Sequence, residues 1–164
     1  MTPKLRKANQ KDKDSIALFL DKYFSSKMNL DKDSRYIYLM EMGKSIVGIA
    51  FLSSSIISTF YPVSRKQRKE DDLLDKLGFK DNEYMIIERI FLLEEENLSY
   101  MFSYLESIFH NIDWIIMENK RERITFYENR RFFDFGLIDG FEKYEKSHLL
   151  ARRYIRMGLA SWSF

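Results

Sequence analysis

The chain has 164 residues, the length of a single domain, and 45% of them are hydrophobic, which excludes a disordered chain. Lys and Arg number 27 against 25 Asp and Glu, so the formal net charge of +2 is far below that of a dedicated nucleic-acid binder. The absence of cysteine excludes disulfides, thiol nucleophiles and cysteine-ligated zinc. The sequence also shows no leader-like segment and no apolar run of membrane-spanning length, so a cytoplasmic protein is predicted.

A short strand followed by an amphipathic helix is predicted at the start of the chain. Residues 5–8 are expected to form the strand, and Asn9 with Asp12 is typical of a capping box at the beginning of a helix. The apolar residues that follow recur at helical spacing and are expected on one face: Ile16, Phe19, Leu20, Tyr23 and Phe24.

A hairpin and a helical insertion are predicted next. Residues 35–41 and 44–59 are rich in β-branched and aromatic side chains and meet at Gly43, which suits a tight turn. Pro62 ends this hairpin, and residues 62–82 are expected to form a short helical insertion between strands.

The second half of the sequence predicts two strand–helix pairs and a closing hairpin. Residues 83–93 are typical of a mostly buried strand, 114–117 of a central strand, 121–132 of a helix, and 136–146 and 148–157 of two paired strands. A long helix is expected after the first of these strands, because apolar residues recur there at helical spacing: Leu98, Met101, Phe102, Leu105, Ile108, Phe109 and Ile112.

The element order is therefore βα, ββ, an α insertion, βα, βα and ββ. It predicts one α/β (α+β) domain over residues 1–157, with a central mixed, mostly antiparallel sheet flanked by helices. Residues 158–164 are expected to be a C-terminal tail, in which Trp162 and Phe164 offer aromatic surface for this domain or a partner.

This order and two local motifs resemble the GNAT acyltransferases. The stretch Glu88 to Leu92 resembles the family's strand before the coenzyme A loop, and Phe126 to Phe132 is similar to its Leu-Tyr-Glu-x-x-Gly-Phe helix end, with Arg131 in place of the glycine. The resemblance covers residues 5–157. It implies a GNAT-like fold, transfer of an acetyl or acyl group, acetyl-CoA as the donor, and a small-molecule or peptide amine as the acceptor.

The resemblance also implies the site residues. Tyr127 would protonate the leaving thiolate as a general acid, and a helix tyrosine packed under the sheet is the alternative. Glu88 is the candidate base, because the family's usual base position falls on Ile86; a salt-bridge or strand-edge role is the alternative. The residues expected to contact coenzyme A are Phe91, Leu92, Leu93, Asn97, Ser99 and Asn119.

The coenzyme A loop departs from the family pattern. In GNAT proteins a glycine turn at a helix N-terminus lets backbone N–H groups cradle the pyrophosphate. Here the pattern Arg/Gln-x-x-Gly-x-Gly/Ala falls on Asn97, Tyr100 and Phe102, directly after the glutamates 94–96. Two hypotheses follow: an N-acyltransferase, or a non-catalytic GNAT-fold binding or interaction module that has lost coenzyme A binding. A homodimer is the assembly considered for the second hypothesis.

Other polar clusters are weaker signals. His110 and His148 lie far apart in the sequence and indicate neither a metal site nor a Ser-His-Asp arrangement. Basic clusters at residues 65–69 and 120–131 adjoin acidic residues, which favours a solvated, salt-bridged face over contact with RNA.

Overall fold

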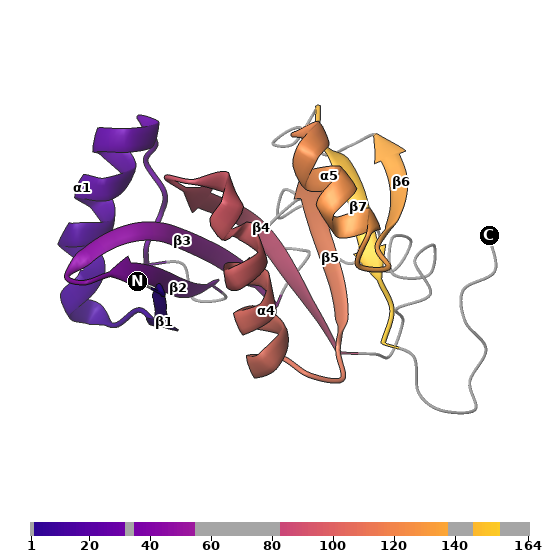
Figure 1. Cartoon of the computed structure of the whole chain (residues 1–164), viewed down its shortest axis with the longest axis horizontal. Coiled ribbons are helices and arrows are strands. Elements are labelled where there is room, and N and C mark those ends of the chain that lie inside the picture. Colours follow the sequence, from indigo (N-terminus) through magenta and orange to yellow (C-terminus); the bar gives the residue numbers. More distant parts are fainter. Residues whose placement is uncertain (1, 32–34, 55–82, 138–145, 155–164) are drawn as a thin grey trace, which may run out of the picture. The chain divides into compact units, whose positions relative to one another are not determined.

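The strands of this chain form one mixed sheet in the order β1-β2-β3-β4-β5-β7-β6 (Figure 1). The structure, a computed structural model, describes residues 2–31, 35–54, 83–137 and 146–154. The predicted fold class and the order of its strands and helices are confirmed over these residues. The predicted insertion at 62–82 and the predicted tail at 158–164 lie outside them.

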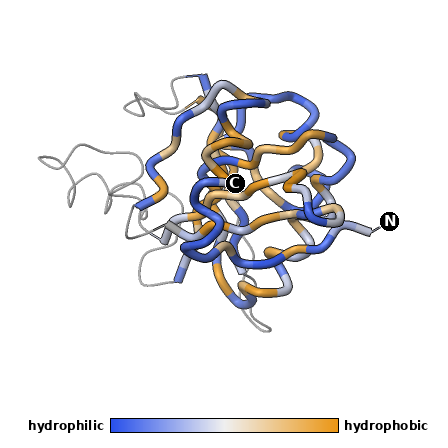
Figure 2. Tube along the Cα trace, turned by 90° about the vertical axis from the view of Figure 1, so that its left-hand side faces the viewer, coloured by the Kyte–Doolittle hydropathy of each residue, from blue (hydrophilic) through white to orange (hydrophobic). Residues whose placement is uncertain are grey.

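The chain divides into two units, each discontinuous in sequence. The first unit is Met1–Leu52 with Glu88–His110, and the second is Ser53–Ile87 with Asn111–Phe164. The elements of the first unit are β1 (Lys4–Lys7), α1 (Lys13–Phe24), β2 (Arg35–Met42), β3 (Ser45–Ser53), the second half of β4 (Tyr84–Leu92) and α4 (Leu98–Ile108). Stretches of hydrophobic residues alternate with stretches of hydrophilic residues along the chain (Figure 2).

The predicted capping box is present at the beginning of the first unit. The backbone N–H of Asn9 donates to Asp12 Oδ2 at 2.8 Å, and the N–H of Lys11 donates to Asn9 Oδ1 at 2.9 Å. The box caps a 3-10 turn, Gln10–Asp12, that leads directly into α1. The guanidinium of Arg6 joins the network at 2.7 Å from Asp12 Oδ1 and 2.7 Å from Glu41 Oε1, so β1, β2 and the helix start are tied together.

Alternate residues of β2 meet different helices, as the two-residue period of a strand requires. Leu39 belongs to the core cluster that α1 covers, whose buried members are Ile16, Phe19, Leu20, Leu39, Ile49, Phe51 and Phe91. Its neighbour Tyr38 instead meets Tyr104 of α4 at 6.0 Å and Phe109 at 5.8 Å between ring centroids. The two helices therefore cover opposite faces of β2.

Gly43 and Gly48 shape the β2–β3 hairpin in different ways. Gly43 has φ +62° in the turn, a conformation that glycine adopts without strain and that the predicted tight hairpin requires. Gly48 is buried within β3, and a Cβ there would lie 2.7 Å from Leu92 Cδ2. A side chain at Gly48 would thus disturb the end of β4.

The second unit is built around β5 (Asp113–Glu118), whose side chains are almost all buried. It pairs in parallel with the first half of β4 and antiparallel with β7 (His148–Arg152), while β6 (Phe133–Leu137) pairs antiparallel with β7. Helix α5 (Arg121–Glu128) contacts both β6 and β7. A near-continuous apolar run is typical of such a central strand.

Predicted boundaries on both sides of the turn after α5 are wrong, and the strand predicted over 148–157 ends at Arg152. The helix expected over residues 121–132 ends at Glu128, because Arg131 adopts φ +70° and reverses the chain. The strand expected from Gly136 begins at Phe133, directly after this turn. Apolar periodicity runs through Phe132 without a break, so the pattern alone did not reveal the reversal.

Candidate functional site

Six of the eight predicted site residues belong to the first unit, and five of these lie on one strand–turn–helix connection. Phe91 and Leu92 end β4 and are 8% and 5% exposed, whereas Leu93 is 40% exposed. The N–H of Leu93 donates to the carbonyl of Val47 at 3.0 Å. Asn97 and Ser99 follow at the start of α4, both half-buried.

The turn between β4 and α4 is strongly acidic. Glu94, Glu95 and Glu96 are all exposed, and a 3-10 turn over Glu95–Asn97 leads into the helix. A hydrogen bond and charge repulsion from the Glu96 carboxylate raise the pKa of Glu94. These carboxylates complement the positive end of the α4 dipole, and they oppose the approach of another anion.

The side chains at the two glycine positions of the family pattern behave differently from each other. Tyr100 is 51% exposed on α4, so its ring projects from the helix. Phe102 is fully buried, as its place on the apolar face of the helix predicts. A phosphate approaches the backbone N–H groups closely where glycine leaves no side chain in the way, and both of these positions carry a large aromatic side chain.

The candidate base Glu88 lies inside β4. Its side chain is 1% exposed, and other groups of the protein engage it. Ile86, at the family's usual base position, is completely buried and apolar. Burying a carboxylate without hydrogen-bonding or charged partners costs free energy, so the stability of the buried Glu88 side chain depends on the groups that engage it.

The remaining predicted residues, Tyr127 and Asn119, belong to the second unit. Tyr127 is 1% exposed on α5, with ring centroids 5.2 Å from Phe126 and 5.4 Å from Phe132. Asn119 is exposed directly after β5, and its N–H donates to Glu118 Oε2 at 2.9 Å. The other oxygen of Glu118 is 3.4 Å from the Arg123 guanidinium.

Asp134 and His148 form a carboxylate–imidazole pair that sequence reasoning missed. His148 Nδ1 lies 2.8 Å from Asp134 Oδ2 and 3.1 Å from Oδ1. The strand was predicted to begin at Gly136 instead of Phe133, so Asp134 fell between a predicted helix and a predicted strand and was not paired with His148. Had the strand been started at Phe133, Asp134 and His148 would have fallen on neighbouring strands.

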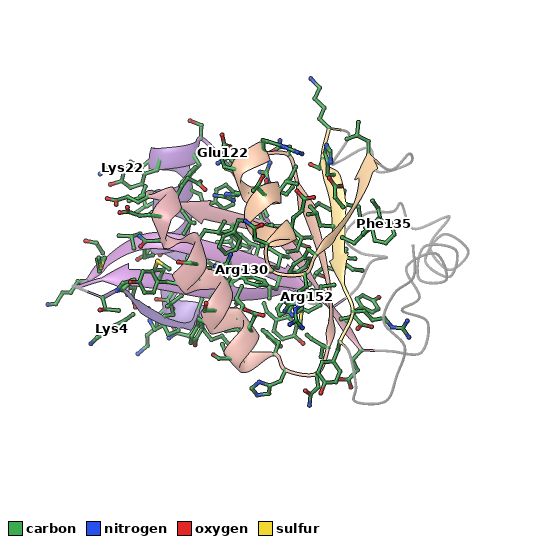
Figure 3. All side chains as sticks on the ribbon, turned by 45° about the vertical axis from the view of Figure 1, so that its right-hand side comes forward. Lys4, Lys22, Glu122, Arg130, Phe135 and Arg152 are labelled. Atoms are coloured by element: carbon green, nitrogen blue, oxygen red, sulfur yellow. The ribbon has the colours of Figure 1, made fainter. Side chains whose placement is uncertain are left out.

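Arg152 of β7 holds the turn that follows α5. Its Nη1 donates to the carbonyl of Arg130 at 3.0 Å, and its guanidinium lies over the Phe132 ring at 4.9 Å. Figure 3 labels Arg130 and Arg152 among the side chains. The Arg130 guanidinium lies over the Phe126 ring at 3.6 Å. Arg130 and Arg152 are thus engaged with backbone and aromatic groups of their own unit.

A cavity of about 410 Å³ lies in the first unit, and none of the residues that line it is a predicted site residue. The Lys13–Asp31 ion pair, 2.8 Å between Nζ and Oδ2, lies at its rim. Its lining residues are Lys7, Ala8, Asn9, Gln10, Lys13, Ile16, Leu30, Asp31 and Ile37. Among the residues described, no group of three potential metal ligands gathers, and no helix is long and apolar enough to cross a membrane.

No family model and no curated protein sequence matches the chain. Among solved structures it resembles the histone acetyltransferase HPA2 and related acetyltransferase from Corynebacterium glutamicum, with TM-score 0.67 and 11% identity over 97% of this chain and 100% of that one. It also resembles FeeM, an N-acyl amino acid synthase from uncultured soil microbes, with TM-score 0.62 and 12% identity over 93% and 90%.

A third likeness is to Arabidopsis thaliana NAA60 in complex with acetyl-CoA, with TM-score 0.59 and 11% identity over 92% of this chain and 98% of that one. At such low identities the likeness shows the fold alone. The predicted GNAT-like fold is thereby confirmed.

Proposed function

We propose that this chain, which has the GNAT-like fold, is an N-acyltransferase that moves an acyl group from a coenzyme A thioester to an amine. The observation that carries the proposal is the extent of the likeness: 97% of this chain is matched by the whole of an acetyltransferase chain. Another structural neighbour was solved with acetyl-CoA. Fold by itself does not fix chemistry, so the proposal rests also on the residues of the chain.

The acyl donor is a substrate that the end of β4 and the start of α4 would hold. The exposed Leu93 offers apolar surface there, and the half-buried Ser99 offers a hydroxyl at the beginning of the helix. Phe91, Leu92 and Asn97 complete this segment. The acidic turn at 94–96 opposes the pyrophosphate, so we propose that binding energy comes mainly from the acyl and pantetheine part of the donor.

Titration calorimetry with acetyl-CoA and with coenzyme A tests the proposal. Binding of acetyl-CoA in the micromolar to low millimolar range is expected, together with release of free thiol when amines are supplied. Absence of binding at millimolar ligand would exclude the enzyme. A panel of amino acids, polyamines and short peptides identifies the acceptor class.

Tyr127 is the proposed general acid for the leaving thiolate. Proton donation by a positioned side chain contributes typically ~10²–10⁴-fold to a rate. Tyr127→Phe is therefore expected to lower thiol release by at least about tenfold while donor binding is retained. Tyr23→Phe is the matched control, because Tyr23 is 48% exposed on α1.

A second candidate function is a non-catalytic GNAT-fold binding or interaction module. The burial of both Tyr127 and Glu88 at 1% exposure favours it, as do the acidic turn and the projecting Tyr100 ring. In that case Tyr127→Phe and Glu88→Gln would change stability and leave no activity to lose. Thiol release that depends on Tyr127 would remove this candidate.

A further inference from the structure

The Asp134–His148 pair is supported by an irregularity in the backbone of β6. Asp134 and Leu137 have partners on β7 at a shifted register, which marks a bulge between them. Gly136, inside the bulge, has φ +78°, and its N–H donates to Asp134 Oδ1 at 2.7 Å. Bulges of this kind redirect side chains and occur often beside active sites.

This arrangement fixes the imidazole of His148. A carboxylate accepts hydrogen bonds, so in the neutral ring Nδ1 carries the proton and Nε2 keeps its lone pair. The His148 side chain is 32% exposed and that of Asp134 is 17% exposed. The pair therefore combines a sheltered carboxylate with an imidazole that solvent and small molecules reach.

The surroundings of His148 are polar and lie within the second unit. Glu118, the last residue of β5, is its cross-strand partner, and Glu118 is paired in turn with Arg123 of α5. Asn119, a predicted donor-binding residue, follows Glu118 in the chain. The charged residues placed near His148 are thus Asp134, which it contacts, and Glu118, which lies opposite it on β5 and is itself paired with Arg123 of α5.

We propose that His148, positioned by Asp134, is the general base that accepts the proton of the incoming nucleophile. The assignment rests on the proposed acyltransferase function and deepens it. Glu88 is 1% exposed within β4, whereas His148 is accessible and has the orientation that a carboxylate partner gives a catalytic histidine. A structural clasp between β6 and β7 is the competing explanation for the pair.

The step balances without any further reactant. A neutral amine attacks the thioester carbonyl carbon as His148 Nε2 takes one N–H proton, and the new imidazolium is stabilised by the Asp134 carboxylate. The C–N bond forms, the C–S bond breaks, and the thiolate takes a proton from the general acid or from water. The imidazolium then returns its proton to solvent, so an amide and a free thiol are the products.

The first test reads the tautomer of the histidine and needs no activity. The sequence contains only two histidines, so His110→Asn leaves His148 as the sole signal in long-range ¹H–¹⁵N spectra. The neutral ring of His148 is expected to carry its proton on Nδ1, and Asp134→Asn is expected to restore the Nε2–H form that free histidine prefers. A wild-type ring protonated on Nε2 would overturn the proposal.

The second test measures thiol release from acetyl-CoA with amines and with water alone, since a base that activates an amine also activates water. His148→Ala is expected to lose at least about 100-fold in kcat with its KM for acetyl-CoA unchanged, and exogenous imidazole is expected to restore part of the rate. Asp134→Asn should lose at least about tenfold, and His110→Asn should match the wild type. Thermal unfolding of each variant establishes that it is folded. His148→Gln is measured beside His148→Ala as a second substitution of the same residue.

The outcomes separate the two levels of the proposal. An active wild type whose rate is unchanged in both His148 variants would overturn the assignment and leave the acyltransferase standing. If the His148 variants lose activity and imidazole does not restore it, while the His148 tautomer does not change in Asp134→Asn, the pair is a structural clasp. That result would also overturn the assignment of His148 as the general base. No thiol release from the wild type with any acceptor would overturn the acyltransferase itself.

Discussion

The N–H of Phe132 donates to the carbonyl of Tyr127 at 3.1 Å, and the two rings pack at 5.4 Å between centroids. The N–H of Arg131 donates to the carbonyl of Glu128 at 3.2 Å. Together these contacts form a Schellman motif with its hydrophobic contact, and they end α5 so that Tyr127 is held beneath Phe132. The left-handed residue that this motif requires is Arg131, at φ +70°.

Arg131→Gly is expected to stabilise the protein. Glycine adopts a left-handed conformation without the steric cost that arginine incurs, so the free energy of unfolding should rise by about 0.5–1 kcal/mol. Arg130→Gly is the matched control and should destabilise, because Arg130 lies over the Phe126 ring at 3.6 Å. Urea denaturation measures both, and a less stable Arg131→Gly variant would contradict the strain argument.

The end of α5 is only partly predictable from the sequence. Arg131 was identified as standing at the family's glycine position, and the structure puts it in the conformation that glycine favours. The end of α5 was nevertheless predicted too late, because a left-handed arginine carries no turn signal of its own. The beginning of α4 was predicted correctly, since its buried residues Leu98, Met101, Phe102 and Leu105 repeat at helical spacing. Its end was predicted too late, because the helix stops at Ile108, before Phe109 and Ile112.

The sequence predicted some residues of the candidate site and missed others. The resemblance could nominate Tyr127 and Glu88 by position in a motif, but their near-complete burial depends on packing between segments distant in the sequence. The Asp134–His148 pair depends on the register of two strands and on a bulge, neither of which local residue patterns specify. The burial of Tyr127 and Glu88 and the pairing of Asp134 with His148 are both set by tertiary structure.

Gly48→Ala is expected to destabilise the protein by about 1–3 kcal/mol, the usual range for overpacking a core. The added methyl would lie 2.7 Å from Leu92 Cδ2 and 3.3 Å from the Phe91 carbonyl. Because part of the clash is with a side chain, Leu92→Ala should cost less in the Gly48→Ala background than in the wild type. A double-mutant cycle by urea denaturation measures this coupling, and strict additivity would contradict the proposed contact.

Acid denaturation should report the Arg6–Asp12 pair. A hydrogen bond from the Arg6 guanidinium lowers the pKa of Asp12 to about 2, from an ordinary value of 3.8. The pair therefore stabilises the folded state fully above pH 4 and loses this contribution as the pH falls toward 2. Arg6 is 39% exposed on its side chain, so solvent screening keeps the effect modest.

Asp12→Asn is the variant that isolates this contribution. It should lower the free energy of unfolding near pH 7 by about 1 kcal/mol, through loss of the ion pair and of the charged cap, and the difference from the wild type should shrink below pH 3. Asp14→Asn, an exposed carboxylate in the first turn of α1, is the control. A difference at pH 2 as large as that at pH 7 would show that Asp12 acts through something other than its charge.

Neutralising the acidic turn should strengthen binding of coenzyme A. Replacement of Glu94, Glu95 and Glu96 by glutamine removes repulsion of the pyrophosphate at the start of α4, and affinity is expected to rise about tenfold at low salt. Acetyl-pantetheine, which lacks the pyrophosphate, should bind wild type and variant alike. Equal gains for both ligands, or a gain insensitive to salt, would contradict an electrostatic origin.

The bulge in β6 has a consequence for the solution behaviour of the whole protein. Among the described strands β6 is the last in the sheet order, and an outer strand can template association with another chain. The left-handed Gly136 and the shifted register interrupt its regular row of hydrogen-bonding groups. The distortion that aims Asp134 at His148 thus also guards this edge against aggregation, so straightening β6 would risk insolubility as well as misplacing the carboxylate.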